Sequence, residues 1–153
     1  MDAKGAGLTA AVFAVVGVGV GLVAAVGAGW AETALATAAT GETARFGPVF
    51  VAQSYLAVTA TALIGAPLVA GVLGVLFGSR AYDAREAAAT SGVGGGVGAL
   101  IYGFVVVALV VVSQGEAATQ AHGVGDALGP LLTTAVVAAV VGAATGALGS
   151  VTG

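Results

Sequence analysis

Four long stretches of this sequence contain no charged side chain: residues 5–30, 48–78, 92–112 and 129–151. An α-helix advances about 1.5 Å per residue, so about 20 mainly apolar residues are enough to cross the roughly 30 Å hydrocarbon core of a bilayer. All four stretches reach that length. The sequence therefore predicts an all-α membrane protein, a four-transmembrane-helix bundle that forms one integral membrane domain over residues 1–153.

Composition excludes an ordinary water-soluble surface, because 7% of the residues are charged and 59% are hydrophobic, whereas about a quarter of a typical globular chain is charged. Valine-rich segments also favour β-strands in soluble proteins. Strands of membrane barrels, however, alternate apolar and polar residues, and residues 105–112 read VVVALVVV, apolar on every face. Backbone groups in lipid must bond within such a segment, which predicts helices.

The first apolar stretch is predicted to be an uncleaved membrane helix. A secretory signal has a basic head and an apolar core of about 7 to 15 residues. Here the uncharged run is much longer, and its head carries Asp2 beside Lys4.

Basic residues near the span ends predict the orientation, since loops that contain Lys and Arg are retained in the cytoplasm. Lys4 precedes the first span, Arg45 follows it, and Arg80 and Arg85 lie between the second and third spans. This distribution favours a cell-membrane protein with both termini in the cytoplasm. The opposite loops would then be acidic, with Glu32, Glu42, Glu116 and Asp126. With lysine nearly absent, this acidic bias favours a salt-adapted source.

The two connections of the expected hairpins resemble each other. Each begins with an Ala-Glu or Gly-Glu pair and ends with Gly-Pro, at Gly47-Pro48 and Gly129-Pro130. Proline suits the first turn of a helix, where its missing N–H would have no partner. A duplicated helical hairpin, with parallel halves, is one interpretation. Chance similarity within a sequence dominated by Ala, Gly and Val is the other.

Glycines four residues apart occur in every span or at its edge. Residues with this spacing share one face of a helix and let another backbone approach closely. Packing within the bundle and packing in a homo-oligomer are both compatible with the pattern. The predicted helix-packing residues are Gly17, Gly21, Gly74, Gly78, Gly92, Gly96, Gly142 and Gly146.

The second span is the most polar. Pro67 cannot donate to the carbonyl of Leu63 and should kink the helix. One interpretation is a small polar cavity or kink that involves Gln53, Thr59, Thr61, Pro67 and, from the third span, Tyr102. The other is that the hydroxyls bond back to their own helix. For the hydroxyl of Tyr102, Gln53 or Thr59 is the expected partner.

The segment of residues 79–91, which contains Asp83 and Glu86, predicts a short helical extension before the third span. Lys4, Arg80 and Arg85 are candidates for contact with lipid head groups or for fixing the orientation. Trp30 and Tyr82 fall at span ends, as interfacial aromatic residues do.

Chemical motifs are scarce. No ionisable residue lies inside any of the four stretches, which argues against an ion pump or a proton-coupled carrier. There is no cysteine, and the cluster of His122 with Glu116 and Asp126 matches no ligand spacing. We therefore predict no catalytic residue, metal or cofactor, no enzyme activity and no nucleic-acid partner.

The leading functional hypothesis is a non-enzymatic multi-pass component of a cellular or virion membrane. It would act through helix packing with itself, as a homo-oligomer, or with another membrane protein, and membrane lipids would be its other partners. The alternative is a small oligomeric channel or facilitator with a polar cavity along the second span. A third hypothesis is a lipid-interacting or assembly factor that uses Arg80 and Arg85.

Overall fold

The computed structural model describes residues 3–38, 40–115 and 121–152. They form four long helices: α1 (Ala3–Glu32), α2 (Glu42–Gly78), α3 (Ala84–Val112) and α4 (Leu128–Thr152). A short π-helix, η1 (Thr33–Thr37), follows α1. Each long helix is long and apolar enough to cross a membrane, and the described ranges contain no strand. The predicted four-helix architecture of a multi-pass membrane protein is confirmed.

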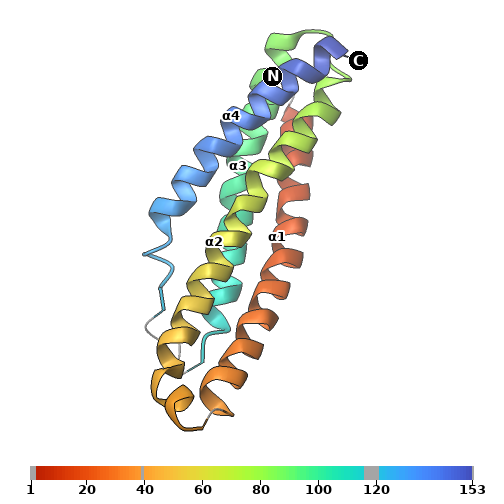
Figure 1. Ribbon diagram of the computed structural model, residues 1–153. Helices are drawn as coiled ribbons and strands as arrows, with labels where there is room; N and C mark the ends of the chain where they lie inside the picture. Colours follow the sequence, from red (N-terminus) through yellow and green to blue (C-terminus); the bar gives the residue numbers. More distant parts are fainter. Residues whose placement is uncertain (1–2, 39, 116–120, 153) are drawn as a thin grey trace.

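The helices run side by side in alternating directions (Figure 1). Both ends of the chain lie at one end of the bundle with the α2–α3 connection, and we call this the terminal end. The α1–α2 and α3–α4 connections lie at the opposite end, which we call the hairpin end. An even number of crossings requires both termini to be on the same side of a membrane.

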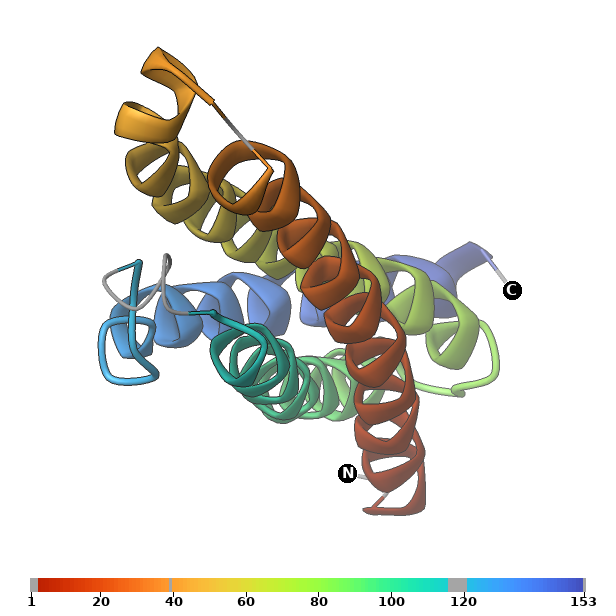
Figure 2. The same cartoon turned by 90° about the horizontal axis from the view of Figure 1, so that it is seen from below.

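Helix α3 is the central element of the bundle. In its most apolar window 44% of the residues are buried, against 22% in α1 and in α2 and 28% in α4. It packs chiefly on α4 and α1, whereas α2 packs chiefly on α4 and makes few contacts with α1. The view along the bundle shows α1 crossing obliquely while α3 and α4 lie side by side (Figure 2). The two hairpins are therefore packed differently, and their duplication remains a prediction from the loop motifs.

Close helix crossings are built on glycine. A Cβ atom placed on Gly142 of α4 would lie 2.6 Å from the Ser91 carbonyl oxygen of α3, and one placed on Gly78 would overlap Gly146. The crossing is less crowded at Gly96, where an added Cβ would lie 3.1 Å from the Cβ of Ala139. All eight glycines singled out in the sequence face a neighbouring helix of the same chain in this way.

One helix start differs from the expectation, and two agree with it. Helix α2 begins at Glu42, so Pro48 lies in the second turn and its predicted place in the first turn is wrong. Gly41, at φ +64°, ends the α1–α2 connection well before Pro48. Glu42 then lies in the first turn of α2, where the helix dipole favours a carboxylate. Pro130 does lie in the first turn of α4. Helix α3 has the predicted extension, because the Asp83 carboxylate accepts a hydrogen bond from Arg85 N at 3.2 Å.

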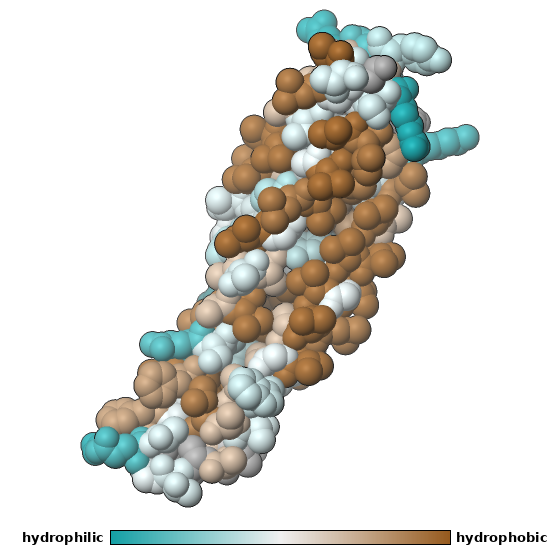
Figure 3. Space-filling view, turned by 45° about the vertical axis from the view of Figure 1, so that its right-hand side comes forward, coloured by the Kyte–Doolittle hydropathy of each residue, from teal (hydrophilic) through white to brown (hydrophobic). Residues whose placement is uncertain are grey.

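On the face shown in Figure 3, the surface of the bundle is apolar along most of its length, and hydrophilic side chains gather toward its two ends. Large apolar side chains are exposed on all four helices, including Val23, Leu68, Phe104 and Val140. Trp30 and Tyr82 are both exposed, at opposite ends of the spans. This distribution suits a protein whose sides face lipid.

Candidate functional site

A cluster of polar groups joins three helices at the hairpin end. The hydroxyl of Tyr55, on α2, lies 2.9 Å from Oε2 of Glu32 and 3.0 Å from the carbonyl oxygen of Ser113. These two acceptors share its single hydrogen. The backbone N–H of Gly115 donates to the same Glu32 oxygen at 3.2 Å. The last residue of α1 thus bonds both to α2 and to the chain that leaves α3.

Hydrogen-bond partners are required here, because burying an unpaired polar group within a membrane span costs about 2–7 kcal/mol. Tyr55 is completely buried, and Glu32 is partly buried. A carboxylate is a strong acceptor for both a hydroxyl and a backbone N–H. The cluster can therefore hold the ends of α1 and α3 against α2.

A second set of bonds adds the α3–α4 connection. Thr59 donates its hydroxyl hydrogen to the carbonyl of Tyr55 at 2.8 Å, so its oxygen is the acceptor for Nε2 of His122 at 2.9 Å. In this arrangement Nε2 of His122 is the nitrogen that donates to Thr59. Nδ1 is buried and has no hydrogen-bond partner among the described residues. The side-chain amide of Gln114 also donates to the carbonyl of His122, at 3.0 Å.

A cavity of about 140 Å³ lies beside this pair. Thr59, His122 and Asp126 supply its polar side chains; its apolar wall is formed by Leu56, Ala60, Leu63, Ala127 and Pro130. Further along the bundle axis Leu63, Ala66 and Tyr102 are buried and fill the interior. The cavity is therefore small, has mostly apolar walls, and is bounded by the buried side chain of Leu63.

The residues predicted to share a cavity along the second span are separated in the structure. Thr59 is buried in the cluster, while Gln53 and Thr61 are exposed on the outside of α2 and Pro67 is half-buried. Residues two positions apart on a helix point about 200° away from each other, because the helix turns by about 100° at each residue. Thr59 and Thr61 therefore cannot line the same cavity, and that expectation is wrong.

Tyr102 bonds neither of its expected partners. Its hydroxyl donates to the carbonyl oxygen of Ala62 on α2 at 2.6 Å. Gly65 leaves the space for this hydroxyl, since a Cβ there would lie 2.8 Å from it. The ring also packs edge-on against Phe13 of α1, with centroids 6.3 Å apart. The expected bond to Gln53 or Thr59 is replaced by a backbone contact that joins α2 and α3.

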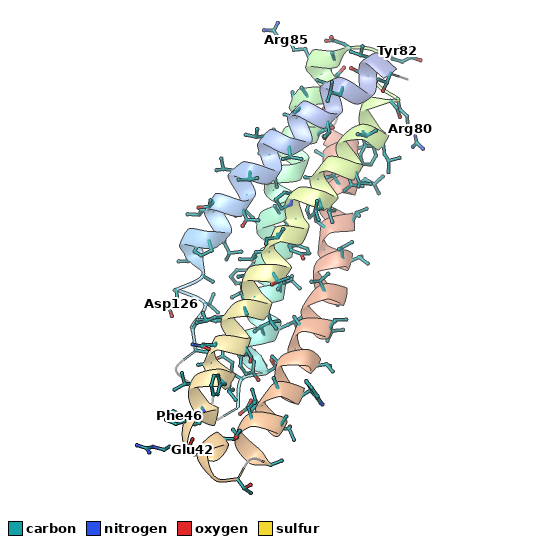
Figure 4. All side chains as sticks on the ribbon, viewed as in Figure 1. Glu42, Phe46, Arg80, Tyr82, Arg85 and Asp126 are labelled. Atoms are coloured by element: carbon teal, nitrogen blue, oxygen red, sulfur yellow. The ribbon has the colours of Figure 1, made fainter. Side chains whose placement is uncertain are left out.

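The basic residues lie toward the two ends. Lys4 and Arg80 line one pocket at the terminal end, whereas Arg85 is outside it, near the start of α3 (Figure 4). At the hairpin end the Arg45 guanidinium lies 5.4 Å from the centre of the Phe46 ring. Among the described residues no three of His, Cys, Asp and Glu come together as metal ligands. Glu116, considered with His122 in the sequence, lies outside the described residues.

The sequence signal for the Glu32–Tyr55 pair is weak but real. Tyr55 lies in the most polar of the four uncharged stretches. Glu32 is also the first charge after the first apolar stretch. His122 has no comparable signal, because its contact with Thr59 depends on how the α3–α4 connection folds back over α2.

Comparisons with known proteins do not assign this chain to a family. No protein-family model, curated protein or solved structure matches this chain. Its function is therefore argued from its own surfaces and contacts.

Proposed function

We propose that this chain is a non-enzymatic component of the cell membrane that acts through helix packing with a second copy of itself or with another membrane protein. Both termini would lie in the cytoplasm, because Lys4, Arg80 and Arg85 are at the terminal end and Arg45 is at the other. The main support is an apolar groove on the outside of the bundle, between α1 and α2.

This groove has a volume of about 510 Å³. From α1 it is lined by Gly19, Val20, Val23, Ala24 and Gly27, and from α2 by Ala57, Val58, Thr61 and Ala62. It exists because α1 packs on α3 and makes few contacts with α2. Small residues on both walls leave room for the backbone of a further helix.

The α1 wall of the groove differs from the glycine contacts inside the bundle. A Cβ on Gly19 or Gly27 would have no atom within 4 Å, whereas the eight packing glycines already contact neighbouring helices. Gly19, Val23 and Gly27 follow at intervals of four residues, so a small residue alternates with a β-branched one along one exposed face. In a symmetric pair Val23 of one copy could fit against a glycine of the other.

The filled interior supports this proposal over a channel through a single copy. The cavity at Thr59 ends at Leu63, and the buried side chains of Ala66, Ala70 and Tyr102 occupy the space beyond it. A conduit would need continuous polar or hydrated lining. An oligomeric pore stays the alternative and would be recognised by solute flux in liposomes that contain the assembled protein.

The test uses two glycines on the same helix. Gly27→Ile fills the groove, and the matched control Gly29→Ile makes the same change about 200° around α1, where a Cβ also has no atom within 4 Å. Native mass spectrometry of the detergent-released protein would record oligomers and co-purifying proteins. We expect Gly27→Ile to weaken the assembly at least about tenfold, an effect of about 1.4 kcal/mol, and Gly29→Ile to leave it intact.

Two results would overturn the proposal. One is a wild-type protein that is monomeric and without a protein partner both in detergent and in nanodiscs. The other is an assembly that survives Gly27→Ile unchanged. Loss of a homo-oligomer would identify a second copy as the partner, and loss of a different co-purifying protein would identify that protein.

A further inference from the structure

A second pocket, separate from the α1–α2 groove, lies at the terminal end. Its volume is about 440 Å³, and it is formed by the start of α1, the end of α2, the α2–α3 connection and the start of α3. Charged side chains at its mouth are Lys4, Arg80 and Glu86, and its hydroxyl groups belong to Tyr82, Thr90 and Ser91. The pocket thus brings together residues that are about 75 positions apart in the sequence.

The pocket is amphipathic in a way that suits a membrane surface. Leu8 and Phe77 line its apolar side; Leu8 is 56% exposed on the flank of the bundle, where lipid chains would lie. Arg80 and Tyr82 extend outward at the end of the bundle (Figure 4). The pocket therefore spans the level at which lipid head groups give way to acyl chains.

The charge of the pocket favours an anion. Two cations, Lys4 and Arg80, face one carboxylate, Glu86. Lys4, Glu86 and Thr90 already have interactions within the protein, so a ligand would join an existing polar arrangement. Arginine binds phosphate through a planar fork of donors, and a lysine ammonium binds it as a point charge.

We propose that this pocket binds the phosphate head group of an anionic phospholipid, with its acyl chains leaving past Leu8 and Phe77. The phosphate lies between Lys4 and Arg80, and the apolar side of the pocket accepts the beginning of the chains. Glu86 opposes a second negative charge and limits the site to one phosphate. A soluble phosphate compound shares the same head-group chemistry, but it does not use the apolar side of the pocket.

Binding can be measured with the full chain in nanodiscs that contain equal parts of phosphatidylglycerol and phosphatidylcholine. After mild release, native mass spectrometry counts the lipids retained by each protein. We expect preferential retention of phosphatidylglycerol. Arg80→Gln and Lys4→Gln should each reduce it about tenfold, which corresponds to the loss of about 1.4 kcal/mol of binding free energy.

Arg85→Gln is the matched control, because Arg85 is an exposed cation at the same end that does not line the pocket. The Arg85→Gln variant should change the retention of phosphatidylglycerol by less than about twofold, well under the roughly tenfold change that corresponds to 1.4 kcal/mol. Equal losses in Arg80→Gln and Arg85→Gln would show a diffuse charge effect and overturn the site. The absence of any preference over phosphatidylcholine would overturn it too.

Two further variants separate lipid from soluble phosphate. Phe77→Ala and Leu8→Ala should lower the retention of phosphatidylglycerol but leave the binding of glycerol phosphate unchanged. If millimolar glycerol phosphate displaced the lipid and neither variant affected retention, the lipid assignment would be wrong. Retention that falls in both variants, and that survives glycerol phosphate, is the result expected from the proposal.

Discussion

At the scale of single residues, glycines with the same sequence spacing have two different environments. Gly142 lies against the Ser91 carbonyl, and no side chain fits there without moving a helix backbone. Gly27 belongs to an equally glycine-rich stretch but has open space where its Cβ would be. A four-residue spacing thus predicts that helices approach closely, and the rotation of each helix decides which glycines are used.

The first prediction follows from this difference. Gly142→Ile should destabilise the bundle by at least about 1–3 kcal/mol, the usual cost of overpacking, because its Cβ would meet backbone rather than a flexible side chain. Gly96→Ile should cost less, since its first neighbour is the Cβ of Ala139 at 3.1 Å. Thermal unfolding in detergent, followed by circular dichroism, provides the measurement. Wild-type stability of Gly142→Ile would contradict the α3–α4 crossing described above.

At the scale of helices, the hairpin end is joined by hydrogen bonds and the centre by close packing. Glu32 and Tyr55 connect α1 to α2 at the point where the α1–α2 groove begins to open, and the Ser113 and Gly115 backbone adds the end of α3. Few apolar contacts hold α1 against α2. The polar cluster therefore has a larger share in positioning this pair than it would in a tightly packed hairpin.

The second prediction concerns this cluster. Glu32→Ala should lower the free energy of unfolding by about 1.5–3 kcal/mol, as expected for hydrogen bonds to a charged group. Tyr55→Phe should cost less after Glu32→Ala than in the wild type, and a double-mutant cycle measures that coupling. Glu42→Ala is the control, because Glu42 is exposed in the first turn of α2. Strictly additive losses for Glu32 and Tyr55 would mean that the hydrogen bond contributes nothing.

The elements themselves were largely predictable from the sequence, because uncharged length alone identifies a span. The boundaries of the helices were less predictable. Helix α2 begins at Glu42, before Pro48, because Gly41 adopts a positive φ that could not be predicted from the sequence. The site was mostly unpredictable. These helices are apolar on every side, so no amphipathic stripe tells which face turns inward. That rotation decides whether Thr59 or Thr61 faces inward, and the contact of Thr59 with His122 depends on it.

At the scale of the whole molecule, the two ends differ in charge. Among the described residues, the terminal end holds Lys4, Arg80 and Arg85 with the carboxylates of Asp83 and Glu86, whereas the hairpin end holds Arg45 with the carboxylates of Glu32, Glu42 and Asp126. Figure 4 labels Arg80 and Arg85 at the first end and Glu42 and Asp126 toward the second. Lys and Arg near span ends are retained in the cytoplasm, which is the basis for the proposed orientation. In the proposed orientation, the pocket proposed to bind phospholipid would lie in the inner leaflet.

The third prediction tests this orientation. The chain has no cysteine, so a single one can be introduced and labelled without a background signal. Gly125→Cys marks the hairpin end at an exposed position with open space around it, and Tyr82→Cys marks the terminal end at a fully exposed one. A membrane-impermeant maleimide should label Gly125→Cys in intact cells and Tyr82→Cys only after permeabilisation. The reverse pattern would place both termini outside.

The central position of α3 has a consequence for how the protein is made. The first half of this helix is mostly glycine between Gly92 and Gly98, and each glycine favours the helix about 1 kcal/mol less than alanine does. Its close partners there include Ala139 and Gly142 of α4, which is synthesised after α3. Until α4 has been synthesised, the side of α3 that carries Gly92 and Gly96 therefore lacks its partner helix, whereas Gly94 and Gly98 can already pack against Thr9 and Phe13 of α1. Completion of the bundle is then a late event of biogenesis, set by the arrival of α4.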